Sequence, residues 1–187
     1  MSTYKDRMAQ KKRKTALFVP AEPYDEKYML LAVEQAKQAE RLGEVPVGAI
    51  VVYDGRVISS AHNRCESAKS ALFHAEVEAI RNACSAIGGW RLDRCTLYVT
   101  LEPCPMCAGA IINSHLGRVV YGAKDPAAGA FGSVVDLADY PLGYNPKLTR
   151  GVLADQCSEI LRSFFSEVRT CAKTDNIKGK GDINEKN

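Results

Sequence analysis

Apolar residues recur at helical intervals early in the chain. Between positions 25 and 42, five of them share one face of a helix: Met29, Ala32, Val33, Ala36 and Ala39. Asp25 can cap the start of this helix, and Gly43 offers a stop. The pattern therefore predicts an amphipathic helix over residues 25–42, with one face against other structure.

A β-hairpin is predicted directly after this helix. Residues 47–53 form an apolar run, and residues 56–60 form a second strand-like run. Asp54-Gly55 lies between them, and this dipeptide is a strong signal for a tight hairpin turn.

The rest of the chain alternates strand and helix patterns. Helices are predicted over residues 74–85, 105–114 and 155–171, a short helix over 136–140, and strands over 95–101, 118–122 and 147–153. Strand followed by helix, repeated after one hairpin, predicts an α/β fold. We expect a three-layer α/β/α sandwich around a mixed sheet of about five strands.

Length and composition fit one domain. The chain has 187 residues, 46% of them hydrophobic, which suffices for a single core over residues 23–172. No apolar run approaches the roughly 18 residues of a membrane span. Seven cysteines without a framework spacing favour a reducing compartment. We therefore expect a cytoplasmic protein with no membrane partner.

The two ends differ from this domain. Residues 1–14 hold six Lys or Arg against one Asp, an excess of +5, whereas the whole chain carries +3. We expect residues 1–22 to be a flexible basic arm, which either attracts phosphate or stays solvated. Residues 173–187 lack an apolar stripe and are expected to be a disordered tail.

Two short motifs carry the candidate chemistry. His74-Ala75-Glu76 and Pro103-Cys104-Pro105-Met106-Cys107 together supply one histidine and two cysteines. Three protein ligands leave a tetrahedral Zn²⁺ one open position, as in catalytic rather than structural zinc sites. The order H-x-E…P-C-x-x-C is the signature of zinc-dependent deaminases, in which the Glu carries protons. A four-ligand structural site would need a further ligand, for which His62, Cys65 and His115 are available.

Both motifs must lie at helix starts for these side chains to meet. In mid-helix, residues two apart point in nearly opposite directions, but at the first turn His74 and Glu76 can flank one ion. Cys104 and Cys107 are three apart and share one side of a first turn, near the positive end of the helix dipole. Asn63, in a predicted loop, reads from the residues alone as a turn residue.

Beyond the metal motif, residues 25–169 resemble the bacterial tRNA-specific adenosine deaminase family of the cytidine deaminase-like superfamily. The resemblance rests on residues 44–49 (EVPVGA), 62–64 (HNR), 96–104 (TLYVTLEPC), 107–111 (CAGAI), 129 with 132–133 (G, GS), 151–153 (GVL) and 164–165 (FF).

This resemblance implies a function and a site. It implies conversion of adenosine to inosine at the wobble position of a tRNA anticodon stem-loop by a homodimer with one Zn²⁺ per subunit. Zinc-bound hydroxide would attack the base while Glu76 shuttles protons. His74, Cys104 and Cys107 match the zinc ligands. Substrate-binding residues are matched by Asn63, which would hydrogen-bond the base, and by Asp125 and Asn145, near the RNA.

Two departures and two alternatives bear on the RNA substrate. Pro146-Lys147 stands where the family often has His-Arg, and Ser166-Glu167-Val168 stands where basic residues are common. A free-base or nucleotide deaminase acting on guanine or cytosine compounds would use the same metal site without RNA. A noncatalytic zinc-containing RNA-binding module would keep the metal but would not need Glu76.

Overall fold

The computed structural model describes residues 17–181, with side chains described to residue 170. A six-stranded mixed sheet forms its centre, in the order β1-β6-β5-β4-β2-β3. The strands are β1 (Leu17–Phe18), β2 (Gly48–Tyr53), β3 (Arg56–His62), β4 (Cys95–Leu101), β5 (Arg118–Ala123) and β6 (Lys147–Arg150). β2 runs antiparallel to both β3 and β4, while the remaining pairs are parallel.

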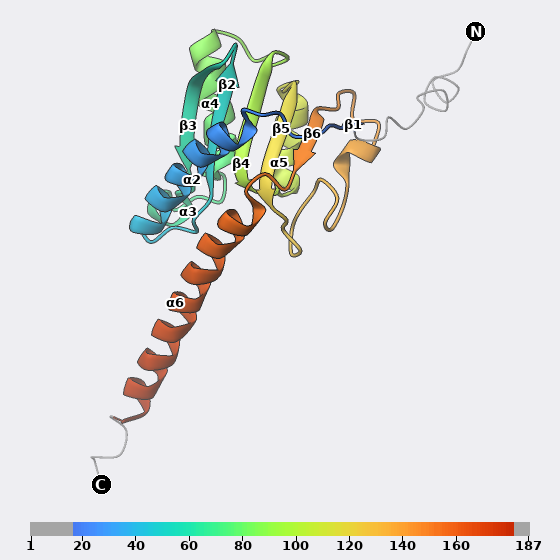
Figure 1. Cartoon of the computed structure of the whole chain (residues 1–187). Helices are drawn as coiled ribbons and strands as arrows, with labels where there is room; N and C mark the ends of the chain where they lie inside the picture. The colour runs from blue at the N-terminus through green and yellow to red at the C-terminus, as the bar shows by residue number, and fades with distance from the viewer. Residues whose placement is uncertain (1–16, 182–187) are drawn as a thin grey trace, which may run out of the picture.

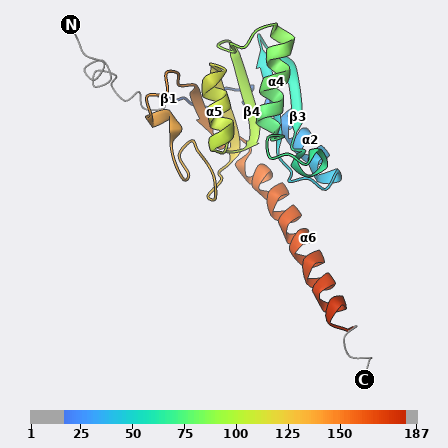
Figure 2. The ribbon, with the colours of Figure 1, turned by 180° about the vertical axis from the view of Figure 1, so that it is seen from behind.

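Helices cover both faces of this sheet, as Figures 1 and 2 show from opposite sides. They are α2 (Asp25–Arg41), α3 (Cys65–Ala68), α4 (Ala75–Ile87), α5 (Pro105–Asn113), α6 (Ala154–Gly181) and the 3-10 turn η1 (Leu137–Asp139). The predicted α/β/α sandwich is confirmed. None of the helices in the described part of the chain is long and apolar enough to span a membrane.

Side-chain alternation in the strands explains why the sheet needs two helical layers. In β2, Ala49 and Val51 pack in the core cluster that contains α4 and α5 residues. Ile50 and Val52 point the other way, into a cluster with Met29 of α2. Because all four side chains are buried, β2 reads as a continuous apolar run.

The predicted hairpin is confirmed. Tyr53 pairs with Arg56, and the two turn residues between them, Asp54 and Gly55, have φ values of 46° and 75°. Two consecutive positive φ values identify the type I′ turn, whose twist matches that of the flanking strands.

The structure corrects the sheet and both predicted ends. Leu17 and Phe18, assigned to the arm, pair in parallel with Lys147 and Leu148 and add a sixth strand. Two residues are too few to give a recognisable period. The last helix continues to Gly181, beyond the predicted end at 171, because residues 172–178 contain no proline or glycine to stop it. Residues 1–16 and 182–187 of the predicted arm and tail lie outside the described residues.

Asp25 does not cap α2 as expected. It is the first helical residue, is fully buried, and accepts hydrogen bonds from the Tyr98 hydroxyl at 2.8 Å and from two Arg118 nitrogens at 2.8 and 2.7 Å. The Glu22 backbone N–H donates to the same carboxylate at 2.7 Å. Asp25 therefore links the start of α2 to Tyr98 of β4 and Arg118 of β5.

Candidate active site

The N-terminus of α4 presents a histidine and a carboxylate to the same space. His74 is the N-cap residue, with extended backbone angles (φ −70°, ψ 146°), and Glu76 is the second residue of the helix. This change of backbone angle at the helix start lets two residues that are two apart converge, as the sequence predicted. Glu76 is 4% exposed.

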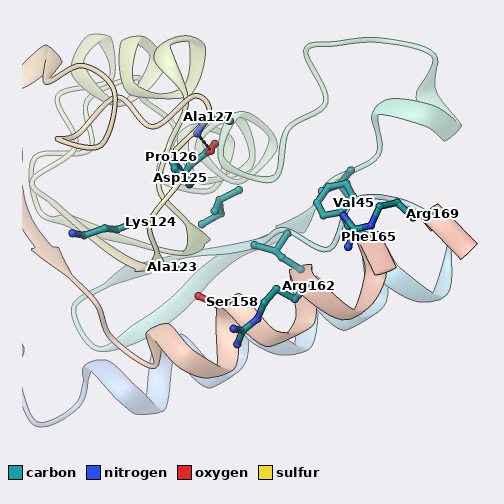
Figure 3. Close-up of a pocket in the computed structure, with 12 residues that line it drawn as sticks. Val45, Ala123, Lys124, Asp125, Pro126, Ala127, Ser158, Arg162, Phe165 and Arg169 are labelled. Atoms are coloured by element: carbon teal, nitrogen blue, oxygen red, sulfur yellow. Dashed lines mark hydrogen bonds between the residues drawn. The ribbon is translucent and has the colours of Figure 1, made fainter. Parts of the chain in front are cut away.

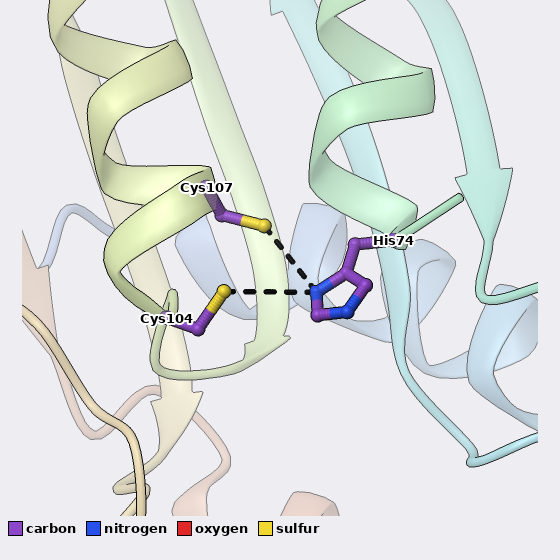
Figure 4. Close-up of side chains that lie close together, drawn as sticks. All are labelled: His74, Cys104 and Cys107. Atoms are coloured by element: carbon purple, nitrogen blue, oxygen red, sulfur yellow. Dashed lines mark hydrogen bonds between the residues drawn. The ribbon is translucent and has the colours of Figure 1, made fainter. Parts of the chain in front are cut away.

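The N-terminus of α5 supplies the two sulfur atoms. Cys104 is the N-cap residue, again extended (φ −70°, ψ 171°), and Pro105 begins the helix where an N–H is not needed. Cys107 lies buried in the first turn. Figure 4 shows both thiols pointing toward the His74 ring across the gap between the two helix ends.

The distances between these atoms fit a tetrahedral zinc ion. The Nδ1 atom of His74 lies 3.7 Å from the Cys104 sulfur and 3.5 Å from the Cys107 sulfur. Zinc bonds of about 2.3 Å to sulfur and about 2.0–2.1 Å to nitrogen at tetrahedral angles would place nitrogen and sulfur about 3.6 Å apart. Within the described residues, this group contains no fourth His, Cys or carboxylate, so His62, Cys65 and His115 do not complete a structural site.

The ionisation of the three donor side chains, His74, Cys104 and Cys107, also suits a cation. A hydrogen bond from the Cys107 thiol lowers the pKa of Cys104 to about 4 despite burial, which favours the thiolate form of Cys104. That same bond, together with burial, raises the pKa of Cys107. A hydrogen bond to Cys104 raises the pKa of His74. Binding of a metal would displace the shared proton, as ligation by two thiolates requires.

Burial raises the pKa of Glu76 to about 7. A carboxyl group with a pKa near neutrality can both accept and donate a proton under ordinary conditions, which a general acid–base group must do. A cation held by the three donors would favour the ionised, proton-accepting form.

A pocket of about 250 Å³ opens in front of these groups. Its wall is made of Val45, Val47, Asn63, Cys65, His74, Glu76, Leu101, Glu102, Cys104, Asp125 and Ala128. Sites that enclose a drug-sized ligand are larger, about 300–1,000 Å³, so this pocket suits one small planar ring system.

The structure brings two of the three predicted substrate-binding residues to this pocket. Asn63 and Asp125 both line it. Asn145 does not line it, and its side-chain amide donates to the Ala138 carbonyl at 2.7 Å. The location of Asn63 favours the role implied by the resemblance over a plain turn residue.

Comparison with known proteins identifies the family. The MafB19-like deaminase family model matches residues 24–169. A tRNA-specific adenosine deaminase of Bacillus subtilis (strain 168) is 46% identical over 146 residues, which cover 78% of this chain and 91% of that protein. This chain belongs to the tRNA-specific adenosine deaminase family, within the MafB19-like deaminases.

Two solved structures are also similar to this chain. One, from a study of A-to-I editing by tRNA:A34 deaminases at the wobble position, superposes with a TM-score of 0.71 and 43% identity. The match covers 72% of this chain and 99% of that one. A guanine deaminase from Bacillus subtilis is 40% identical, with a TM-score of 0.51, over 53% of this chain and 64% of that one.

A second, larger cavity of about 580 Å³ adjoins the pocket of this family member. It lies between the segment 123–127 after β5 and the exposed side of α6, and it shares Val45, Leu101 and Asp125 with the smaller pocket. Figure 3 shows Arg162 and Arg169 of α6 and Lys124 at the margins of this cavity. The deamination pocket therefore continues into an open region bordered by positive charge.

Two buried glutamates of the site had no predicted role. Glu44 and Glu102 are each 1% exposed and accept hydrogen bonds from the two loops that carry Asn63 and Asp125. In the sequence, each is a single charged residue beside an apolar strand segment. Burying a carboxylate there is costly unless it is fully hydrogen-bonded. A lone glutamate at such a position was therefore the sequence signal that could have identified both residues.

Proposed function

We propose that this protein hydrolyses adenosine to inosine at the wobble position of a tRNA anticodon, using one Zn²⁺ per subunit. The observation that carries the proposal is the convergence of a three-donor metal group, a buried carboxyl group and Asn63 on one pocket. Family membership supports tRNA as the substrate, because the Bacillus subtilis relative is named for that activity. Translation takes place in the cytoplasm, where the protein would act.

His74, Cys104 and Cys107 would hold the metal. Their nitrogen–sulfur spacing and the thiolate character of Cys104 support this assignment. When bound, zinc supplies Lewis acidity that lowers the pKa of a coordinated water from about 16 to about 7. Two anionic sulfur ligands would limit the net positive charge at the site.

Glu76 would move the protons of the reaction. Water adds at C6 of adenine and ammonia leaves, so one proton must reach ring nitrogen N1 and another the departing amino group. The Glu76 carboxylate would take one proton from the attacking water and give it to N1. It would then take the second proton from the oxygen added at C6 and give it to the departing amino group, which leaves as ammonia. Its burial and its raised pKa support both halves of this cycle.

Asn63, Asp125 and Asn145 would contact the substrate. Asn63 has amide groups that can hydrogen-bond a base edge in the pocket, and Asp125 lies where this pocket meets the larger cavity. The base must leave the anticodon stack to enter, because stacking hides its edge. Asn145, 20 residues further along from Asp125, would act outside the pocket, and a homodimer would supply additional RNA-binding surface.

The test is inosine formation in an arginine-type anticodon stem-loop by the zinc-loaded protein. The Glu76→Gln variant and a panel of free nucleosides and bases serve as comparisons. Inosine at the wobble position from the unaltered protein alone is the expected result. An active Glu76→Gln variant would contradict the proton-carrying role.

A second candidate is deamination of a free base such as guanine, which the similarity to the guanine deaminase of Bacillus subtilis favours. Ammonia released from a free base, with no inosine in the stem-loop, would retain the site chemistry and replace the RNA substrate. The higher coverage and TM-score of the tRNA:A34 deaminase match favour RNA.

A further inference from the structure

Glu44 lies behind the pocket wall, between the end of α2 and the start of β2. Its Oε2 atom accepts a hydrogen bond from the Asn63 side-chain nitrogen at 3.3 Å and another from the Glu66 backbone at 3.1 Å. Its Oε1 atom accepts from the Ser67 backbone at 2.7 Å. One carboxylate thus joins the pocket asparagine to the first turn of α3.

The charge of Glu44 is maintained by these donors. Burial by itself raises the pKa of Glu44, but hydrogen bonds from the Ser67 and Glu66 backbones outweigh it, so the pKa lies below its ordinary value. Glu44 is consequently an ionised group with acceptor capacity only. Any group that faces it must be a donor.

The second atom of the Asn63 amide also has a defined partner. Its Oδ1 accepts from the Cys65 thiol at 3.3 Å. Burial raises the pKa of Cys65, so that residue stays a thiol and can donate. A rotation of the amide by half a turn would place Oδ1 against the Glu44 carboxylate and the NH₂ group against the thiol hydrogen. The contact between Oδ1 and the carboxylate would then be repulsive, because neither group has a hydrogen to donate.

We propose that Glu44 is a positioning residue, which holds the Asn63 amide in one orientation at the pocket wall. With one N–H given to Glu44, Asn63 offers its second N–H and its free oxygen lone pair to a base in a fixed order. This inference rests on the proposed function insofar as Asn63 contacts the base. Discrimination between base edges would then depend on a residue that does not touch the substrate.

Glu78 provides a matched control. It is also a buried glutamate, 7% exposed, and it holds the residue next to Asn63: Arg64 donates to it at 3.1 Å. Arg81 donates to its other oxygen. Glu78→Ala therefore removes a carboxylate that supports the same segment without removing a contact to the Asn63 amide.

The first measurement is solvent exchange of the two Asn63 side-chain amide protons in the ¹⁵N-labelled protein. Glu44→Ala is expected to speed exchange of the protected proton about tenfold or more, as loss of a buried hydrogen bond allows, whereas Glu78→Ala leaves it unchanged. Glu44→Gln, which keeps one acceptor oxygen, should be intermediate and serves if Glu44→Ala does not fold. Equal exchange in unaltered protein and in whichever Glu44 variant folds would overturn the proposal.

The second measurement is a double-mutant cycle on kcat/KM for the anticodon stem-loop. Glu44→Ala should lower kcat/KM about tenfold, but less than about twofold when Asn63 is already alanine, since residues acting through one contact are not additive. Glu78→Ala should have the same effect in both backgrounds. A tenfold loss of kcat/KM from Glu44→Ala in both backgrounds would show that Glu44 does not act through Asn63, and it would overturn the positioning role. If the unaltered protein makes no inosine, the proposed function fails, while the exchange measurement still decides the role of Glu44.

Discussion

The metal side of the pocket, formed by His74, Cys104 and Cys107, and its loop side, which carries Asn63 and Asp125, are supported differently. The metal side needs only two helix starts, so a few consecutive residues fix each ligand. The loop side depends on carboxylates that are distant in sequence: Glu44 lies 19 residues before Asn63, and Glu102 lies 23 residues before Asp125.

Glu102 supports its loop more completely than Glu44 does. It accepts backbone N–H bonds from Phe131 and Ser133, each at 3.0 Å, another from Asp125 at 3.3 Å, and a short bond from the Ser133 hydroxyl. A Cβ atom at Gly129 would come within 2.5 Å of the Glu102 carboxyl carbon. The loop is therefore wrapped closely around this side chain. The metal side is therefore positioned by local backbone geometry at two helix starts, whereas the loop side is positioned by hydrogen bonds to buried carboxylates.

The largest expected effect is on the metal side. Cys107→Ser should lose bound zinc, to below about one-tenth of an ion per subunit, together with all detectable inosine formation, because a serine hydroxyl is a poor substitute for a thiolate. Zinc content by mass spectrometry and stem-loop deamination measure this. Cys157→Ser, which alters a buried cysteine under β5, is the control and should retain its zinc. Full zinc content in Cys107→Ser would show that metal binding does not require this side chain, and it would contradict the assignment of Cys107 to the metal side.

Glu76→Gln is expected to have the next largest effect on activity. This substitution separates metal binding from proton transfer. The amide has the same shape but cannot take up a proton, so we expect normal zinc content and a kcat lower by about 10²–10⁴-fold. Steady-state deamination with a fully zinc-loaded sample measures kcat, and single-turnover deamination isolates the chemical step. A loss smaller than about tenfold would mean that another group carries the protons.

Glu102→Gln tests the loop side. The amide replaces an acceptor with a donor in a site where every partner donates, so at least one buried N–H loses its bond, at a cost of about 1–3 kcal/mol. We expect retained zinc, faster amide hydrogen exchange over residues 125–133, and kcat/KM lower by about tenfold. Exchange identical to that of the unaltered protein would show that the loop holds its shape without the carboxylate.

Asp25→Asn should leave turnover per folded molecule unchanged, since Asp25 is a buried carboxylate away from the pocket. Removing its charge leaves Arg118 buried without an anion, so the free energy of unfolding at pH 7 should fall by about 3–5 kcal/mol. Urea unfolding measures the difference, with Glu34→Gln in an exposed ion pair as a control that should change little.

The same pair gives a defined pH dependence. Burial raises the pKa of Asp25, but the bonds from Arg118, Glu22 and Tyr98 outweigh this effect and lower the pKa overall. The stabilisation is therefore fully present above the unfolded pKa of about 3.9 and is lost as pH falls through the lower folded value. The gap between unaltered protein and Asp25→Asn should narrow below about pH 4. A gap that stays constant down to pH 2 would contradict the lowered pKa.

The sequence alone predicts what depends on local spacing. The hairpin at Asp54-Gly55 and the sandwich architecture follow from residues within one turn or one period. The convergence of His74 with Cys104 and Cys107 was predicted from the H-x-E…P-C-x-x-C signature, in which each half occupies one helix start. The resemblance to the deaminase family added Asn63, which the loop composition alone presented as a turn residue.

Contacts between distant segments could not be predicted in this way. Asp25 looked like a helix cap because its true partners, Tyr98 and Arg118, lie 73 and 93 residues away. The roles of Glu44 and Glu102 were missed for the same reason. The roles of Asp125 and Asn145 toward RNA stay predictions.

The two-residue strand β1 also has a consequence for aggregation. It occupies the outer edge of β6, where Leu17 and Phe18 pair with Lys147 and Leu148 and the Val19 N–H donates to the Leu148 carbonyl at 2.8 Å. An uncovered edge strand offers its backbone groups to a strand from another molecule. A version shortened to begin at Asp25 would keep every pocket residue and still be more prone to self-association, so any truncation for crystallisation or fusion should retain residue 17 onward.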